Sequence, residues 1–181
     1  MSQPPRPSLS VILARLDLAA IADSGDKLRE CEFFLGLASI ETDRARFRWL
    51  ISAYLNSVYS YFETTALYAS VAFTNPETGD PVEDTEAVET LRPYVRICQN
   101  ANRPYFVKTG GLHPVVARLY EVRNASTHRF PLSIMVAGPN LPEDFHLGNI
   151  SGAGEPLLAL CRETLAVVKQ VQAELDVLRN K

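Results

Sequence analysis

The strongest constraint on the fold of this 181-residue chain is a run of mostly apolar residues spaced alternately four and three apart. It lies in segment 43–69, where Ser52, Asn56 and Glu63 fall on the opposite side. This spacing predicts a long amphipathic helix, and its tyrosines are expected in a core or in an interface between copies. The stripe consists of Phe47, Ile51, Tyr54, Val58, Tyr61, Thr65 and Tyr68.

Four further segments favour helix. Segment 24–40 has Ser24 or Asp26 as a candidate N-cap, and segment 84–100 is predicted to be a helix bent at Pro93. Segment 113–130 begins near Pro114 and ends before a second proline, both typical of helix ends. Segment 155–181 repeats the four-three spacing with Leu157, Cys161, Thr164, Val168, Val171, Leu175 and Leu178.

Together these segments predict an all-α fold, a bundle of four or five main helices. Segment 131–152 contains a β-leaning run, a Gly-Pro-Asn turn and a second short run, which predicts a small hairpin or an irregular insertion. Residues 1–22 form a proline-rich start with a short apolar segment. Residues 23–181 are expected to form one helical domain.

Composition narrows the classes of function. A net charge of −3 gives no reason to expect tight non-specific binding to nucleic acid, and no DNA partner is expected. The three cysteines, Cys31, Cys98 and Cys161, have no metal-ligand spacing and are expected as buried thiols in a reducing compartment. The chain shows neither a signal peptide nor a membrane span. We therefore expect a cytoplasmic protein without a metal or cofactor.

Segment 120–131, YEVRNASTHRFP, carries an arginine, an asparagine and a histidine close together. Lysine and glutamate would be enough to keep such a helix face in solvent. On a helical wheel, one side gathers Val115, Leu119, Val122 and Ser126, and it is expected to be buried. The other side is predicted to be a polar face that carries Tyr120, Asn124 and Thr127, bracketed by Arg123 and His128.

These residue types suit a phosphodiester. Arg123 offers a permanently charged donor fork for phosphate oxygens, and His128 can exchange protons near neutral pH. Asn124 can orient either group, and it stands four residues before His128, within contact distance on a helix. The segment therefore predicts a metal-free catalytic site of Arg123, Asn124 and His128, with Tyr120 and Thr127 as substrate contacts.

The pattern Arg123-Asn124-x-x-x-His128, late in an all-α chain with a long aromatic-rich helix before it, resembles the HEPN (higher eukaryotes and prokaryotes nucleotide-binding) domain superfamily. The resemblance covers residues 25–180. It implies a small helical bundle, often a homodimer, whose arginine, following polar residue and histidine form a metal-independent RNA-cleaving site at the dimer cleft.

The resemblance also implies a biological setting, in toxin–antitoxin pairs or phage defence, with an antitoxin or regulatory protein as partner. One departure concerns Phe130. A toxin subgroup of the family has a tyrosine at this place, which its partner nucleotidyltransferase modifies, and phenylalanine lacks the hydroxyl.

Two alternatives stay open at this point. Arg123 could pair with an acid such as Glu121 or one from a neighbouring helix, while His128 benefits from the negative end of the helix dipole. The fold could also serve as a non-catalytic HEPN-like module that binds a nucleotide, RNA or protein.

Overall fold

The computed structural model describes residues 24–72, 86–95, 111–128, 131–148 and 154–180. The side chains of residues 24, 67–72, 88 and 128 are not part of this description. The expected proline-rich start at 1–22 and Cys98 also lie outside it.

Cys31 and Cys161 are fully buried, as expected, and burial raises the pKa of the Cys31 thiol to about 12.

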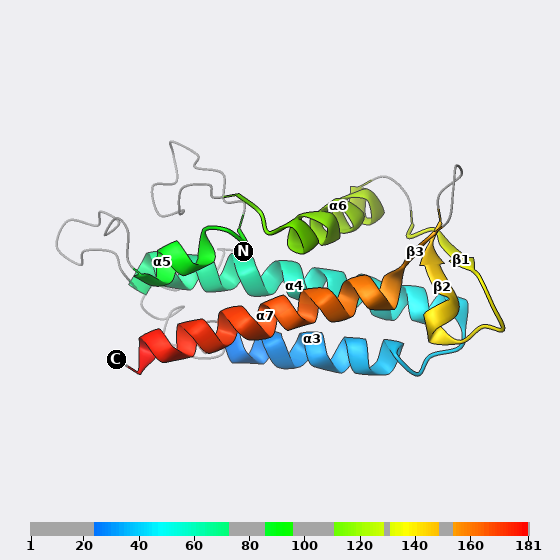
Figure 1. Ribbon diagram of the computed structural model, residues 1–181, viewed down its shortest axis with the longest axis horizontal. Coiled ribbons are helices and arrows are strands. Elements are labelled where there is room, and N and C mark those ends of the chain that lie inside the picture. The colour runs from blue at the N-terminus through cyan, green and yellow to red at the C-terminus, as the bar shows by residue number, and fades with distance from the viewer. Residues whose placement is uncertain (1–23, 73–85, 96–110, 129–130, 149–153, 181) are drawn as a thin grey trace, which may run out of the picture.

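The described residues form a mainly helical bundle with a small sheet at one end, which confirms the predicted fold class (Figure 1). The helices are α3 (Ser24–Ala38), α4 (Arg44–Ala72), α5 (Glu86–Leu91), α6 (Pro114–His128) and α7 (Leu157–Arg179). Helices α3 and α4 form a hairpin, α7 packs along them, and α6 lies against α4 and α7. No helix in these ranges is long and apolar enough to span a membrane.

The insertion after α6 is a hairpin completed by a third strand. Strand β1 (Ile134–Val136) pairs antiparallel with β2 (Phe145–Leu147), which pairs antiparallel with β3 (Glu155–Pro156). A 3₁₀ turn, η1 (Pro142–Asp144), leads into β2, and Asn140 turns the chain with a φ of 69°. Asparagine tolerates this left-handed conformation better than most residues. The aromatic ring of Phe145 joins the sheet to the bundle, since its centroid lies 4.6 Å from that of Phe47 on α4.

The tyrosines of α4 lie in the core and connect α4 to α7. Tyr54 and Tyr61 are fully buried. The Tyr54 hydroxyl donates to the carbonyl of Cys161 at 2.7 Å, and the Tyr61 hydroxyl donates to Oε1 of Gln172 at 3.0 Å. Burial raises the pKa of both phenols, so they remain protonated donors. The side chain of Tyr68 lies outside the description.

Helix α5 differs from its prediction. We expected a helix over 84–100 bent at Pro93, but α5 ends at Leu91, and residues 92–94 form a turn. Residues 84–85 and 96–100 of the expected helix lie outside the description. The Tyr94 amide donates to the Leu91 carbonyl at 3.0 Å within this turn. A proline disfavours the helical conformation of the residue before it, which is Arg92 here. Pro93 therefore ends the helix instead of bending it.

Replacing Phe47 by alanine should lower the free energy of unfolding by about 3–5 kcal/mol, because it leaves a cavity between the bundle and the sheet. Denaturant unfolding followed by circular dichroism measures the change. Phe33→Ala is the matched control, since the Phe33 side chain is 60% exposed. It should change stability by no more than about 0.5 kcal/mol. Equal losses in the two variants would contradict this packing.

Candidate functional site

Helix α6 packs against the bundle through a face that only partly coincides with the expected stripe. Leu119 and Val122 of that stripe are buried, and Val115 and Ser126 are partly buried. The buried face extends beyond it. Val116 and Leu119 are fully buried, and Tyr120 is 5% exposed. These positions follow the i, i+3, i+4 pattern of one helix face, and Arg123 occupies the next position of the same row. Arg123 therefore points toward α4, partly buried, instead of flanking an outward polar face.

The expected placement of Tyr120 on the polar face is wrong. Its ring packs on that of Tyr59 of α4, with 5.1 Å between centroids, and its hydroxyl is buried without a hydrogen-bond partner. Burial raises the pKa of this phenol. The physical reason is that most of a tyrosine side chain is apolar, so it can continue a buried stripe that a wheel counts as polar. The contact of Tyr120 with substrate stays a prediction.

The guanidinium of Arg123 is held by three groups. Its Nε donates to Oδ1 of Asn56 on α4 at 3.2 Å, and its Nη1 donates to Oδ1 of Asn124 at 3.1 Å. Its Cζ lies 4.3 Å from the centroid of the Tyr59 ring, a cation–π contact. We call Arg123, Asn56, Tyr59 and Asn124 the Arg123 cluster. Two of the five guanidinium N–H groups are used, so donors remain for an anion.

The charge of Arg123 is not neutralised by a direct ion pair. The open alternative of pairing with Glu121 is wrong, because Glu121 accepts from Arg118 at 3.0 Å. Arg118 also forms an ion pair with Glu155 of strand β3, at 2.7 Å. Across the described ranges, no carboxylate lies within ion-pair distance of Arg123. An arginine with a fixed orientation and no paired acid is suited to bind an external phosphate.

Glu63 is an acid whose pKa is influenced by the charge of Arg123. It lies on α4, one turn beyond Tyr59, and is half-buried. Burial raises its pKa, while the positive charge of Arg123 acts in the opposite direction. When ionised, the Glu63 carboxylate therefore interacts with the charge of Arg123 at longer range, and it accepts no hydrogen bond from the guanidinium.

The remaining predicted site residues lie at the C-terminal end of α6. Asn124 and Thr127 are exposed, and the Thr127 hydroxyl donates to the carbonyl of Arg123 at 2.8 Å. His128 is the last residue of α6, and its side chain is outside the description. The structure therefore brings Arg123 and Asn124 together, while the contact between Asn124 and His128 stays a prediction.

Helices α4 and α6 run antiparallel (Figure 1). Asn56 meets Arg123, whereas Tyr59, further along α4, also meets the earlier residue Tyr120. The end of α6 that carries His128 therefore lies beside the N-terminal half of α4, and Glu63 lies toward the other end of the cluster. This geometry separates Glu63 from His128 and disfavours the two as a direct acid–base pair.

Asn56, Tyr59 and Glu63 were missed as site residues. Their spacing of three and four was visible as a polar stripe on α4, opposite its apolar stripe. What the pattern lacked was the partner, because Asn56 and Arg123 are 67 positions apart. Pairing of two polar stripes on separate helices is the signal that could have suggested the contact.

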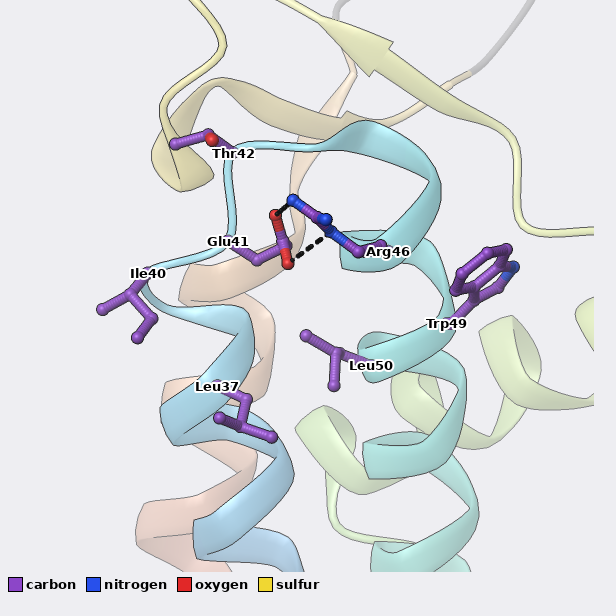
Figure 2. Close-up of a pocket in the computed structure, with 7 residues that line it drawn as sticks. All are labelled: Leu37, Ile40, Glu41, Thr42, Arg46, Trp49 and Leu50. Atoms are coloured by element: carbon purple, nitrogen blue, oxygen red, sulfur yellow. Dashed lines mark hydrogen bonds and ion pairs between the residues drawn. The ribbon is translucent and has the colours of Figure 1, made fainter.

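A pocket of about 530 Å³ lies between the end of α3 and the start of α4 (Figure 2). Leu37 and Leu50 line its apolar part. The polar part is an ion pair in which the carboxylate of Glu41 takes two bonds from Arg46, at 2.9 and 3.0 Å. Because these charges satisfy each other, the pocket offers no free charge for a ligand. In the described part of the chain, no three His, Cys, Asp or Glu side chains cluster as metal ligands.

Comparison with known proteins adds no family assignment. The chain matches no protein-family model, no curated protein and no solved structure. The functional argument therefore depends on the residues of the chain and their arrangement.

Glu63→Gln should stabilise the protein at neutral pH, and the gain should disappear at acidic pH. A raised pKa in the folded state means that folded protein binds the proton more tightly, so stability falls as pH rises from the ordinary glutamate pKa through the raised value. Glutamine avoids this loss. Melting temperatures of both proteins between pH 3 and 8, about the range that spans this titration, measure the effect.

Glu163→Gln is the control for this prediction, because Glu163 is exposed on α7. Its melting temperature should follow that of the wild type at every pH. A Glu63→Gln protein that is less stable than the wild type at neutral pH would contradict the assigned burial cost.

Proposed function

We propose that the chain is a HEPN-like, metal-independent ribonuclease. The observation that carries this proposal is the Arg123 guanidinium, oriented by Asn56, Asn124 and Tyr59 without a directly paired acid among the described residues. The order of Arg123, Asn124 and His128 along one helix supports the same reading. The proposed setting is the cytoplasm, in a toxin–antitoxin or phage-defence system.

In the proposed reaction, the ribose 2′-oxygen attacks phosphorus and the 5′-oxygen leaves, which gives a 2′,3′-cyclic phosphate and a 5′-hydroxyl end. Arg123 stabilises the charge on the non-bridging oxygens, and Asn124 orients the guanidinium. His128 transfers a proton, either from the 2′-hydroxyl or to the leaving 5′-oxygen. One histidine provides one of these two transfers.

A homodimer would supply the second transfer. The proposed cleft places His128 of each copy on either side of the RNA, so that one copy acts as base and the other as acid. A dimer in sedimentation analysis at micromolar concentration is expected. A monomer at that concentration, together with full activity, would contradict this arrangement.

Purified protein should cleave single-stranded RNA in the presence of EDTA and leave 2′,3′-cyclic phosphate and 5′-hydroxyl ends. His128→Ala should lower the rate by about 10²- to 10⁴-fold, the usual contribution of acid–base catalysis. Arg123→Ala should reduce it about 10²- to 10³-fold through lost charge stabilisation. Gel analysis of labelled RNA, with end-group mapping, measures both the rate and the products.

Asn56→Ala is the matched control for Arg123→Ala. Both variants lose the hydrogen bond between α4 and α6, but only one loses the guanidinium. Asn56→Ala and Asn124→Ala should therefore reduce the rate less than Arg123→Ala does, since they misplace the charge without removing it. Equal losses in Asn56→Ala and Arg123→Ala would indicate a structural role for Arg123. No cleavage of any RNA by the wild type would favour the non-catalytic binding module.

A further inference from the structure

The side of α4 that carries Asn56 continues toward the N-terminus of the helix with Trp49. These two residues are seven apart, so they lie on the same side of the helix, two turns from each other. Arg48 and Ser52, four apart, border this side. In the view of Figure 2, the indole of Trp49 lies on the side of α4 away from α3, and Trp49 is also one of the residues that line the pocket between the two helices. Because α4 and α6 are antiparallel, this part of α4 lies beside the end of α6 that carries His128.

Trp49 is unusually accessible for such a large aromatic side chain. It is 62% exposed, and it is the one tryptophan of the chain. Most tryptophan side chains bury far more of their surface, because tryptophan offers the largest apolar area to a core. Trp49 lines the pocket between α3 and α4, but it belongs to neither the core nor the Arg123 cluster.

The charges at the start of α4 point to an anionic ligand. Arg44, Arg46 and Arg48 occupy the first turns, where positive charge opposes the helix dipole. Arg46 is neutralised by its two bonds to Glu41. Arg48 forms no ion pair or hydrogen bond within the described ranges, so its charge remains available, as that of Arg123 does.

We propose that Trp49 and Arg48 form a subsite for single-stranded nucleic acid beside the Arg123 cluster. The indole stacks on a nucleobase, and Arg48 neutralises a phosphate next to it. This inference rests on the proposed function and extends it by naming a substrate-binding surface. Trp49 and Asn56 are about 10 Å apart along the helix axis, a separation that a short run of nucleotides spans. An exposed aromatic with flanking cations is typical of single-strand binding.

A protein-binding patch is the competing explanation. Phe33 and Ile40 on the α3 side of the molecule are also exposed, at 60% and 76%. Trp49 also lines the pocket that Leu37 and Ile40 line. The residue before Trp49, however, is Arg48, a cation without an ion pair within the described ranges. An apolar protein surface that covered both would have to bury this charge without compensation, which is costly. Nucleic acid supplies both the base and the phosphate.

The test uses a fluorescein-labelled, 2′-O-methylated RNA oligonucleotide, which cannot be cleaved because the nucleophile is blocked. Fluorescence anisotropy measures its affinity for the full chain. Trp49→Ala should weaken binding about 5- to 150-fold, the range for loss of one stacked base, while Trp49→Phe should retain most of the affinity. Binding of unlabelled oligonucleotide should also quench the fluorescence of the single tryptophan in the wild type.

Arg48→Gln provides a readout that a structural role would not change. The slope of log affinity against log salt concentration should fall by about 0.7, the value for one phosphate contact with a single strand. Phe33→Ala is the matched control, since it removes an aromatic of similar exposure on α3 and should leave affinity and slope unchanged. Melting curves confirm that all variants are folded at the assay temperature.

The outcomes separate this inference from the proposed function. Binding that depends on Trp49 and Arg48, without cleavage of unmodified RNA, supports the subsite and rejects the ribonuclease. Cleavage that depends on His128 and is unaffected by Trp49→Ala, with unchanged affinity, overturns the subsite alone. Absence of oligonucleotide binding by the wild type also overturns it. The subsite is also overturned if a dimer of the wild type dissociates in both the Trp49→Ala and the Phe33→Ala variants while the affinity for the oligonucleotide stays constant.

Discussion

The buried contact between α4 and α7 determines how every other element can lie. Tyr54 and Tyr61 are fully buried, and each hydroxyl finds its acceptor on α7. A rotation or shift of α4 would leave these groups unsatisfied, at about 1–3 kcal/mol for each buried polar group. The rotation of α4 is therefore fixed, and Asn56 and Tyr59, roughly on the opposite side by helix geometry, must meet α6. The position of the Arg123 cluster follows from packing on the far side of the same helix.

Buried polar groups without a hydrogen-bond partner occur on both sides of α4. On the stripe that carries Tyr54 and Tyr61, both phenol hydroxyls are bonded but the Thr65 hydroxyl is not. Toward α6, the Tyr120 hydroxyl is buried without a partner, and burial raises the pKa of Glu63. Partly satisfied polar groups cost stability, and they are commonly retained where a site needs them. Arg123 adds a charge to this side with no acid at ion-pair distance in the described part of the chain. The α4–α6 side therefore combines a stability cost with groups that can bind an anion.

Much of the fold could be predicted because periodicity reports which face of a long helix is buried. Helices α4 and α7 follow their four-three stripes, and six of the seven stripe positions of α7 are buried, with Leu178 partly so. The prediction was weaker where a residue is amphipathic: Leu119 and Val122 are buried as expected, but Tyr120 was counted as polar and left out of the buried face of α6. Arg123 and Asn124 were predicted as candidate site residues from local order, but the contact of Arg123 with Asn56 depends on tertiary packing across 67 positions. The sequence around either residue does not indicate a contact between positions so far apart.

The dependence of the site on α6 links its chemistry to stability. A helix of 15 residues is only marginally stable alone in water, so α6 needs its docking on the bundle. That docking uses Val116, Leu119 and Tyr120, which precede Arg123 in the same row. The cation–π contact of Arg123 with Tyr59 and its hydrogen bond to Asn56 can form only after α6 has packed on the bundle, because Tyr59 and Asn56 belong to α4. The core of α6 therefore acts on function indirectly, by setting the fraction of molecules in which the guanidinium is correctly oriented.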